Sequence, residues 1–383
     1  MDLKEIREKI DSIDNEISKL YVERMNLSKE VAIEKSKNNL PITNYKRERE
    51  ILTRVTKDMP EEIKLYAKRV YETLFETSKA YQASNMSINS KLTKELEKAI
   101  NLKTDFPVSA KVACQGIEGA HAMIAVTKMF QIPEIMYFKD WDAVFNSVEK
   151  GLCQYGVLPI ENSLVGSVNK VYDLINKHNC YIVGSVKLKV EHSLLVKKGT
   201  KLEEIKEIVS HEQALGQCER YIKGLNRDIK IVPCLNTAIA AEMVSKQEGN
   251  SLACISSKMC KEIYDLDSIE DNIQDNKNNY TRFIAISKEL RIFNGADKIS
   301  IMVNLKHEPG ALNKILNIFS INGLNLTKIE SRPIEESPFE FTFYLDFDGD
   351  IQKVSVQNLI VNIENETTNF MFLGSYKEIV WLG

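Results

Sequence analysis

The sequence of 383 residues contains no apolar run that approaches the roughly 18 residues of a membrane span. Its first residues, Met1-Asp2-Leu3-Lys4-Glu5, are charged and therefore unlike a signal peptide. The net charge of −3 also falls short of the basic excess that general affinity for nucleic acid requires. We therefore expect a soluble, cytoplasmic protein whose partners include neither a membrane nor a nucleic acid.

Cysteine and histidine are scarce. The seven cysteines are scattered and never spaced C-x-x-C, and the five histidines are scattered too. This distribution predicts reduced, mostly buried thiols and no metal site. No cysteine or histidine precedes Cys114, so a site in the first hundred residues has no thiol and no imidazole for catalysis. We expect no metal and no cofactor.

The length predicts two or three domains, because the chain is too long for one ordinary core. Changes in composition suggest where the boundaries lie. The predicted parts are an all-helical domain over residues 1–86, a polar linker with a short helix over 87–107, an α/β domain over 108–287 and an α+β domain over 298–383.

The first 38 residues predict one long helix, because apolar side chains recur at steps of three and four. These residues are Leu3, Ile6, Ile10, Ile13, Ile17, Leu20, Leu27 and Val31. The stripe has a gap at Arg24, and Arg7 and Lys35 lie on its edge. A cation among apolar groups costs several kcal/mol unless an anion meets it, so we infer an anionic ligand. The alternative is that each aliphatic stem is buried and each charged head reaches water.

Two more helices are expected, near 44–57 and after Pro60. Their stripes converge with the first on one polar pocket, formed by Arg7, Arg24, Lys35, Arg47, Glu48, Ser78 and Gln82. Several cations with one carboxylate suit a small ligand that carries two or more carboxylates. Such a pocket can catalyse a unimolecular rearrangement by holding the substrate compact and placing a cation where negative charge develops. A dimer that packs two long helices together would cover the apolar seam.

Leu3 to Gln82 resembles the all-helical class of chorismate mutases. The resemblance includes Arg7-Glu8-Lys9-Ile10, Glu23-Arg24, Lys35, Pro41, Arg47-Glu48-Arg49, Ser78 and Gln82. It implies that Arg24 and Arg47, with Arg7 of another subunit, hold the carboxylates of chorismate. It also implies that Lys35 and Gln82 face the ether oxygen and that Glu48 faces the ring hydroxyl. Asn44 stands where the family carries Asp, so it can bind a hydroxyl but brings no charge.

The middle of the chain alternates β-rich runs with helical patterns, which predicts α/β units with mainly parallel sheets. About 180 residues fit two lobes with a cleft between them better than one sheet. The expected strands are Lys111–Cys114, Ile135–Phe138, Tyr155–Pro159, Tyr181–Val186, Leu194–Val196, Ile208–Val209, Ile229–Val232, Leu252–Ile255 and Phe283–Ile286.

Several motifs lie at strand ends in this region. Gly116 and Gly119 follow a strand and suit either an anion-binding turn or a structural turn. Thr281 and Arg282 also have purely structural explanations. The Thr281 hydroxyl could hydrogen-bond its own backbone, and Arg282 could form an ion pair on the surface. Ser210-His211-Glu212 suggests a triad, but neighbours in an extended segment point apart and Ser210 is better explained as a helix cap.

Residues from about Val108 to Ser287 resemble prephenate dehydratase. The match covers the two glycines, Pro159-Ile160-Glu161-Asn162-Ser163, Gly166, Val171-Tyr172-Asp173-Leu174, Ser210-His211, Asn236-Thr237-Ala238 and Thr281-Arg282-Phe283. It implies a two-lobed fold like the periplasmic binding proteins, with the site in the cleft. Thr281 is then the expected indispensable residue, Arg282 binds a carboxylate, and Glu161, Asn162, Ser163 and Phe283 line the cleft. His121-Ala122 departs from the expected aromatic residue and Ser, which removes a hydroxyl from the cleft edge.

The last 86 residues predict a βαββαβ order, the split βαβ arrangement of a ferredoxin-like domain. Gly310-Ala311-Leu312 opens its first helix and Glu330-Ser331-Arg332 ends its second strand; as bare structure both are turns. Both positions nevertheless resemble the ACT domain. The resemblance implies side-by-side pairing and an amino acid bound at the interface, here phenylalanine as a feedback inhibitor.

Taken together, the domains predict a bifunctional enzyme that converts chorismate to prephenate and prephenate to phenylpyruvate, inhibited by L-phenylalanine. A homo-oligomer, either a dimer or a tetramer, is expected. One alternative keeps only the dehydratase active and uses the helical domain for dimerisation. Another is a non-catalytic protein that binds an amino acid.

Overall fold

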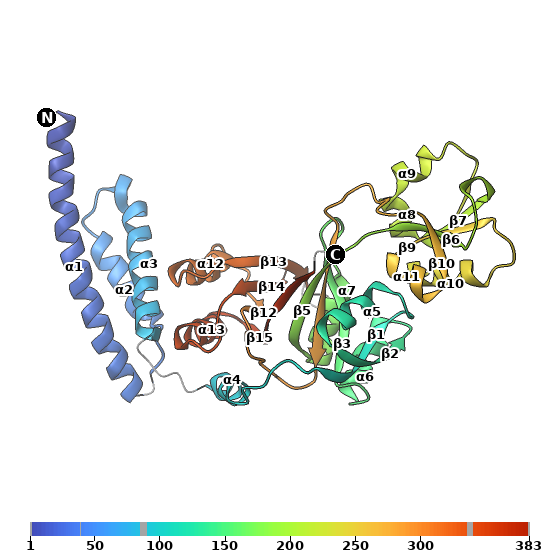
Figure 1. Cartoon of the computed structure of the whole chain (residues 1–383). Coiled ribbons are helices and arrows are strands. Elements are labelled where there is room, and N and C mark those ends of the chain that lie inside the picture. The colour runs from blue at the N-terminus through green and yellow to red at the C-terminus, as the bar shows by residue number, and fades with distance from the viewer. Residues whose placement is uncertain (1, 39, 85–89, 335–339, 382–383) are drawn as a thin grey trace. The chain divides into compact units, whose positions relative to one another are not determined.

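The computed structural model describes residues 2–38, 40–84, 90–334 and 340–381 (Figure 1). It divides into two compact units. The first comprises residues 1–98 and 301–371, and the second comprises 99–300 and 372–383. The expected junction near residue 86 lies outside the described residues.

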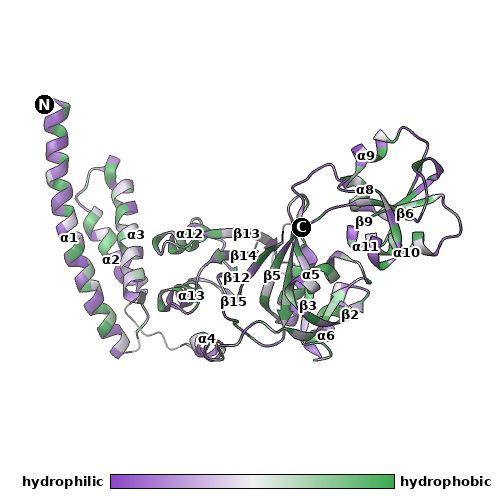
Figure 2. Cartoon of the chain, viewed as in Figure 1, coloured by the Kyte–Doolittle hydropathy of each residue, from purple (hydrophilic) through white to green (hydrophobic). Residues whose placement is uncertain are grey.

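The N-terminal helices form as predicted. The first, α1, begins after an Asp2 cap whose side chain accepts a hydrogen bond from the Glu5 N–H, and Asn44 caps α2 in the same way. Figure 2 shows apolar residues recurring along α1. The helices are α1 (Leu3–Lys37), α2 (Tyr45–Thr56), α3 (Glu61–Ser84) and α4 (Lys91–Asn101).

The apolar seam of α1 is open in the single chain. Only Ser28 and Ala32 of this helix are buried, although α1 packs on α3. The eight seam residues from Leu3 to Val31 are between 39% and 64% exposed. Hydrophobic residues scattered singly on a surface are ordinary, but a continuous stripe of this length needs a partner.

The ferredoxin-like order of the last domain is confirmed, and α12 and α13 pack against α3 within the first unit. Its strands form one sheet in the order β13-β14-β12-β15. The elements are β12 (Lys298–Asn304), α12 (Ala311–Ile321), β13 (Leu326–Pro333), β14 (Phe341–Asp348), α13 (Val354–Glu366) and β15 (Asn369–Tyr376).

The α/β region builds two sheets, as predicted. The first has the order β16-β5-β11-β3-β1-β2, with β4 paired to β3. Its strands and helices are β1 (Ser109–Gln115), α5 (His121–Met129), β2 (Ile132–Phe138), α6 (Trp141–Glu149), β3 (Tyr155–Asn162), β4 (Gly166–Ser167), α7 (Asn169–His178), β5 (Tyr181–Lys189), β11 (Tyr280–Ser287) and β16 (Glu378–Trp381).

The second sheet has the order β10-β6-β9-β7-β8. Its elements are β6 (Ser193–Lys197), η1 (Leu202–Glu204), β7 (Glu207–His211), α8 (Glu212–Gln217), α9 (Glu219–Gly224), β8 (Lys230–Cys234), α10 (Thr237–Lys246), β9 (Leu252–Ser256), α11 (Lys258–Ile263) and β10 (Leu266–Glu270).

The expectation of mainly parallel sheets was wrong, because both sheets are mixed. β11 runs antiparallel to β3 and β5, and β6 runs antiparallel to β9 and β10. The reason lies in the connections. The chain passes from β5 straight into β6 of the other sheet and returns from β10 to β11, so these strands are not joined to their neighbours by right-handed helical crossovers.

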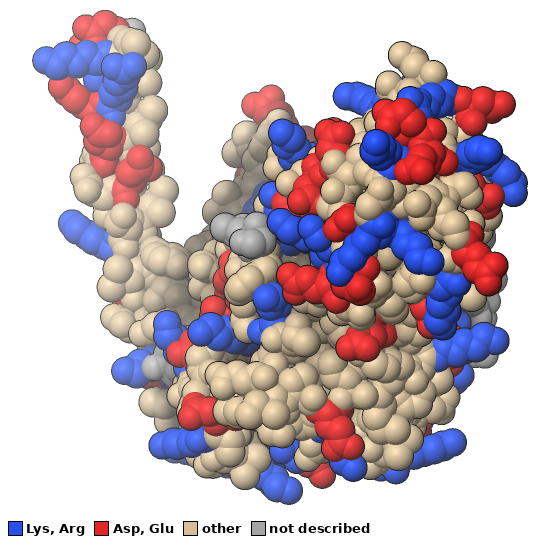
Figure 3. Space-filling model, turned by 45° about the vertical axis from the view of Figure 1, so that its right-hand side comes forward, with Lys and Arg blue, Asp and Glu red and all other residues tan. Residues whose placement is uncertain are grey.

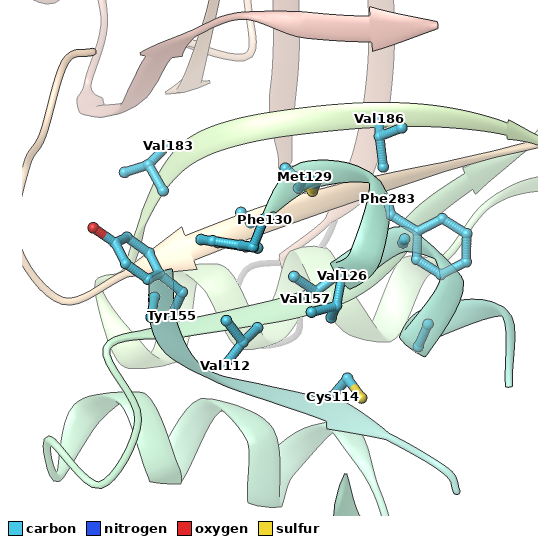
Figure 4. Close-up of a cluster of buried hydrophobic side chains, with 14 of the residues drawn as sticks. Val112, Cys114, Val126, Met129, Phe130, Tyr155, Val157, Val183, Val186 and Phe283 are labelled. Carbon is cyan, nitrogen blue, oxygen red and sulfur yellow. The ribbon is translucent and has the colours of Figure 1, made fainter. Parts of the chain in front are cut away.

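The core of the first lobe lies between its sheet and α5 (Figure 4). Val112 and Val157 face α5, where Val126 and Phe130 pack on them. The opposite face carries Gly156, where a Cβ would lie 2.9 Å from a methyl of Val144 on α6. The missing side chain therefore lets α6 approach the strand closely. This packing fixes the strand ends that carry the predicted site.

Candidate active sites

In the helical domain, the structure brings two predicted cations of α1 to two predicted polar residues of α3. Arg24 Nη1 donates to the Leu74 carbonyl at 3.0 Å and also bonds Ser78 Oγ. Lys35 Nζ donates to Gln82 Oε1 at 3.3 Å and to the Ile42 carbonyl. Arg24 and Lys35 are 11 residues apart, or about three helical turns, and so lie on one face.

These two cations are partly buried and meet neutral acceptors. Among the described residues no carboxylate lies within salt-bridge distance of either. Burial is the main cause that lowers the pKa of both Arg24 and Lys35, while the Glu48 carboxylate partly offsets the effect at Lys35. A ligand carboxylate would supply the missing negative charge.

The α2 side of the site carries Glu48, which pairs with Lys79 at 3.5 Å. Lys79 was not among the residues predicted for this site. It directly follows the predicted Ser78, and its charge also lowers the pKa of Lys35. The side-chain Oδ1 of Asn44 caps α2, where it accepts from the Arg47 N–H at 3.0 Å.

Two predicted residues do not reach this site within one chain. Arg7 is exposed and precedes Arg24 by 17 residues, which is about 25 Å along a helix. Arg47 is exposed and pairs with Glu50 at 3.5 Å. The first observation agrees with an Arg7 that serves the site of another subunit.

A pocket of about 620 Å³ lies in the first unit beside Glu48 and Lys79. Its other wall comes from the last domain, including Gly310 and Glu366. Glu366 accepts hydrogen bonds from Tyr45 at 3.0 Å and from Thr43 at 3.1 Å. Burial, followed by the Glu366 charge, raises the pKa of Tyr45 to about 12, so this phenol remains a donor at neutral pH.

In the α/β region, Asn162 connects the two predicted segments. Its Nδ2 donates to Thr281 Oγ1 and to Asn279 Oδ1, both at 2.9 Å. Its Oδ1 accepts from the backbone N–H groups of Leu164 and Val165. The Asn162 amide is thus fully satisfied, and because Thr281 accepts from it, the Thr281 proton is left to point elsewhere.

Two residues next to Thr281 complete this group. Ser163 Oγ accepts from the Tyr280 N–H at 2.9 Å and donates to the Asn278 carbonyl at 3.1 Å. Asn279 begins the polar segment that leads into Thr281-Arg282-Phe283, but it was not among the predicted site residues. It is fully buried, and its Nδ2 has no hydrogen-bond partner among the described residues. A buried donor without a partner beside Thr281 suits a ligand acceptor.

Arg282 and Phe283 are placed differently from their predicted roles. Arg282 Nε lies 2.7 Å from the carboxylate of Glu378, and its side chain is 7% exposed. Phe283 is 3% exposed and belongs to the core shown in Figure 4. Successive strand residues point to opposite faces, so Arg282 and Thr281 are presented on different sides of the sheet. The pattern of the motif did not reveal this separation.

His192 and Gln217 form a hydrogen-bonded pair that the sequence did not predict, with His192 Nε2 and Gln217 Oε1 2.9 Å apart. The ring of His121 lies edge-on to His192, with centroids 6.1 Å apart. Burial and then the neighbouring His192 lower the pKa of His121 to about 4, and burial also lowers the pKa of His192. Both imidazoles are therefore neutral at pH 7.

Ser210 is not a helix cap, which corrects the prediction. His211 caps α8, since its Nδ1 accepts from the Gln213 N–H at 3.2 Å. Ser210 is fully buried at the end of β7 and donates to the Ile255 carbonyl of β9 at 2.6 Å. The strand continues to His211, two residues beyond the predicted end at Val209, so the side chains of Ser210 and His211 point apart and form no triad.

The glycine turn between β1 and α5 is structural. Gly116 and Gly119 have φ of 105° and 87°, a region that favours glycine. The Gly116 N–H bonds the Phe138 carbonyl at 2.9 Å, and a Cβ on Gly119 would lie 2.7 Å from Cys260 Sγ in the second lobe. Tyr264 of that lobe donates to the Glu118 carbonyl at 2.7 Å. The turn joins the lobes.

The predicted effector residues lie around a smaller hollow of about 160 Å³. Ala311 and Leu312 line it, and Gly310 adopts the left-handed conformation at the start of α12. Glu330, Ser331 and Arg332 lie on β13, where Ser331 is paired with Phe343, another residue of the hollow. The two predicted segments therefore lie near each other in the fold.

No helix among the described residues is long and apolar enough to cross a membrane. Over the same residues no cluster of His, Cys, Asp or Glu has the arrangement of a metal site. All seven cysteines are free thiols, and six of them are buried. On the face shown in Figure 3, acidic and basic side chains are interspersed.

Family models match three consecutive parts of the chain. Chorismate mutase type II matches residues 6–83, prephenate dehydratase matches 112–291 and the ACT domain matches 299–356. The bifunctional chorismate mutase/prephenate dehydratase of Aquifex aeolicus is 32% identical over 379 residues, which cover 98% of each chain.

Two further relatives match over 70% of this chain. Arogenate dehydratase/prephenate dehydratase 2 of Arabidopsis thaliana is 38% identical over 70% of this chain and 72% of its own length. The crystal structure of the Arthrobacter aurescens prephenate dehydratase in complex with L-Phe is 27% identical, with a TM-score of 0.63 over 70% of this chain and 89% of that one.

Proposed function

This chain belongs to the family of bifunctional chorismate mutase/prephenate dehydratases, and we propose how its residues carry out and control the two reactions. It rearranges chorismate to prephenate and converts prephenate to phenylpyruvate. The observation that carries this conclusion is the match to the Aquifex aeolicus enzyme along nearly the whole of both chains.

For the mutase reaction we propose that the half-buried cations bind the substrate. Chorismate carries two carboxylates, and Arg24 and Arg47 would hold them together with Arg7 of a second subunit. Lys35 and Gln82 would face the ether oxygen, which gains negative charge as its bond to carbon breaks. Support comes from the placement of Lys35 Nζ beside Gln82 and from the lack, among the described residues, of a carboxylate paired with Lys35. Glu48, Asn44 and Ser78 would complete the pocket, with Glu48 at the ring hydroxyl.

We propose that the active form is a homo-oligomer in which two α1 helices pack antiparallel. The exposed seam of α1 and the distance of about 25 Å between Arg7 and Arg24 support this arrangement. An antiparallel partner would bring its Arg7 toward the far half of the helix and would cover the seam.

Complementation tests the shared site. Arg7→Ala and Lys35→Ala chains are each expected to lose mutase activity, but co-expression should restore about a quarter of the wild-type rate, because half of randomly paired dimers carry one intact site of two. The rate is measured as loss of chorismate in purified mixed protein. The same variants purified separately and combined at assay, without subunit exchange, serve as the control. No recovery in the mixed dimers would contradict a site built from two chains.

For the dehydratase reaction we propose that Thr281, Asn162 and Asn279 meet the reacting end of prephenate. The ring hydroxyl and the ring carboxylate leave together, so the site must supply a proton for the hydroxyl and donors for carboxylates. Asn162 orients the Thr281 hydroxyl, and the buried Nδ2 of Asn279 is an unused donor next to it in the described structure. Glu161 and Ser163 flank Asn162, and we assign Arg282 to support rather than to substrate binding.

We propose that L-phenylalanine inhibits the dehydratase through the ACT domain. The complex of the Arthrobacter aurescens relative with L-Phe and the hollow lined by Ala311 and Leu312 support this assignment. Gly310, Glu330, Ser331 and Arg332 would form the rest of the site. By linkage, an effector that favours one state must bind that state more tightly. We also propose a cytoplasmic location, to which the seven free thiols are suited.

One assay tests both activities and their control. The full chain is supplied with chorismate, and prephenate and phenylpyruvate are followed with and without saturating L-phenylalanine. We expect both products in sequence and a lower yield of phenylpyruvate with the effector. A Gly310→Val variant, strained at its left-handed φ of 86°, should weaken the inhibition while keeping both reactions. A dehydratase rate that does not respond to phenylalanine would dispose of the regulatory proposal alone.

A further inference from the structure

The chain does not end with the ferredoxin-like domain. After β15, and with only Lys377 between them, β16 joins the first sheet of the dehydratase region as its edge strand. It runs parallel to β5, with Glu378 beside Ser185 and Trp381 beside Leu188. The sequence pattern did not predict this strand.

The edge strand brings one carboxylate to three cations, of which Arg282 and Lys298 are buried and Lys187 is partly exposed. The Glu378 side chain is 10% exposed, and its Oε2 lies 2.7 Å from Arg282 Nε. Its Oε1 lies 2.9 Å from Lys187 Nζ on β5 and 3.7 Å from Lys298 Nζ on β12. Ser185 Oγ also donates to it at 3.1 Å. Removing Glu378 would take away a counter-ion that these cations share.

Arg282 is held at several points besides Glu378. Its Nη2 donates to the Tyr376 hydroxyl at 2.6 Å, and its Nη1 lies 4.0 Å from Glu161 on β3. Tyr376 in turn is hydrogen-bonded to Ser300 at 2.6 Å. Arg282 Nε also donates to Ser185 Oγ on β5 at 3.2 Å, so the guanidinium ties β11 to β3, β5, β15 and β16. A buried arginine needs such compensation, since an unpaired buried charge is strongly destabilising.

The backbone near Arg282 is irregular. Thr281 is paired with Asn162 and Arg282 with Glu161, but Phe283 is paired with Pro159, so the register slips by one residue. Proline has no N–H to donate to a ladder, which explains an irregularity here. A side-chain clamp at Arg282 stabilises the strand at the point where its backbone pairing is interrupted, one residue from Thr281.

We propose that Glu378 is a positioning residue of the dehydratase site, which acts through Arg282 to hold β11 so that the Thr281 hydroxyl stays in register with Asn162. Glu378 lies on the face of the sheet away from Thr281 and does not touch the reacting atoms. The proposal rests on the assigned role of Thr281, and its test separates the two.

The charges around Glu378 keep it ionised. Burial alone would raise the pKa of its carboxyl, but the attraction of Arg282 and the contacts with Lys187 and Lys298 outweigh burial and lower the pKa overall. The contribution of this ion pair to stability is therefore present above the ordinary glutamate pKa of about 4.3 and is lost as the pH falls below it.

The test compares Glu378→Gln and Glu378→Asp in the full chain. Gln keeps the shape but not the charge, and Asp keeps the charge but not the reach. We expect dehydratase kcat to fall about ten- to a hundredfold in Glu378→Gln and less in Glu378→Asp, with KM little changed, because misplacement of a reacting group mainly slows the chemical step. Mutase activity should be unchanged. Full kcat in Glu378→Asp would overturn the proposal even if Glu378→Gln did not fold.

Trp381→Ala is the matched control. Trp381 lies on the same strand, three residues beyond Glu378, where the ammonium of Lys128 lies 3.7 Å from the centroid of its ring. If β16 only stabilises the fold, both Trp381→Ala and Glu378→Gln should lower the unfolding temperature, and the two variants should have the same kcat. Equal losses of kcat in the two variants would overturn the specific role of Glu378.

A double-mutant cycle with Arg282→Met identifies the route. If Glu378 acts through Arg282, the double variant Arg282→Met/Glu378→Gln should have the kcat of Arg282→Met alone. Losses that multiply would contradict the proposal. This cycle does not depend on the role of Thr281: an active Thr281→Ala chain would refute that role, and the coupling of Glu378 to Arg282 would still be measured.

Discussion

Replacement of Thr281 by alanine is expected to reduce phenylpyruvate formation by about a hundred- to ten-thousandfold, the range for a positioned proton donor or acceptor. The Thr281 hydroxyl accepts from Asn162 Nδ2 at 2.9 Å, so its own proton is directed away from Asn162. Without the hydroxyl, Asn162 loses a partner, and under the proposed assignment prephenate loses the group that meets its departing hydroxyl. The rate is measured as phenylpyruvate formed from prephenate.

Thr281→Ser is the control for this prediction, because serine keeps the hydroxyl and removes only the methyl group. We expect Thr281→Ser to retain most of the dehydratase rate and Thr281→Ala to retain the mutase rate of the same chain. An unchanged unfolding temperature in both variants shows that the effect is local. A Thr281→Ala chain with ordinary dehydratase turnover would refute the role given to this residue.

Replacement of Lys35 by alanine is expected to slow the mutase by about a hundred- to a thousandfold, as when one preorganised donor to a developing negative charge is removed. Lys35 Nζ lies 3.3 Å from Gln82 Oε1, and no described carboxylate is paired with it. Substrate binding should weaken less than turnover, because the charge on the ether oxygen develops mainly in the transition state. Both KM and kcat are obtained from the rate of chorismate consumption at a series of chorismate concentrations.

The dependence of mutase activity on alkaline pH is a second test of Lys35. Burial lowers the pKa of Lys35 from its ordinary 10.5, so the mutase should lose activity at high pH earlier than an exposed lysine would require. Lys35→Ala should lack this limb. Lys37→Ala is the matched control: Lys37 is exposed on the same last turn, pairs with Glu34 at 3.6 Å and should leave the rate unchanged. Near-normal turnover of Lys35→Ala would remove the electrostatic account.

Two of the alternatives left open by the sequence, a non-catalytic binding protein and solvent-exposed cations on α1, disagree with the family match and with the structure. A non-catalytic binding protein does not agree with a chain that matches a bifunctional enzyme over 98% of both lengths. The snorkelling alternative predicts Arg24 and Lys35 heads in open water. Both are instead partly buried and hydrogen-bonded to α3.

Local pattern predicted the elements of this fold well. The 3.6-residue period found α1, α2 and α3, and the βαββαβ order of the last domain was correct. The short edge strands β10 and β16 were missed, because four or five residues without a turn signal carry little periodic information. The prediction of mainly parallel strands was also wrong. Whether a strand runs parallel or antiparallel to its neighbour depends on which sheet the chain enters next.

The site was predicted in its residue types and only partly in its geometry. Thr281 and Asn162 were placed in one site and do contact each other, although 119 residues separate them. Arg282 was assigned to the same site by the resemblance to prephenate dehydratase. The alternation of a strand puts neighbouring side chains on opposite faces, and the anion that Arg282 meets lies 96 residues further along the chain, in a strand that the pattern did not show.

The sequence by itself determined the helices, the order of the domains and the presence of half-buried cations on α1, because these depend on residues close together in the chain. The tertiary structure decided which polar groups meet: Lys79 with Glu48, Asn279 with Asn162, and Glu378 with Arg282. Such pairings depend on strand register and on helix packing over long separations. A one-residue change of register turns every side chain of a strand to the other face, so contacts of this kind are fixed only when the whole sheet has formed.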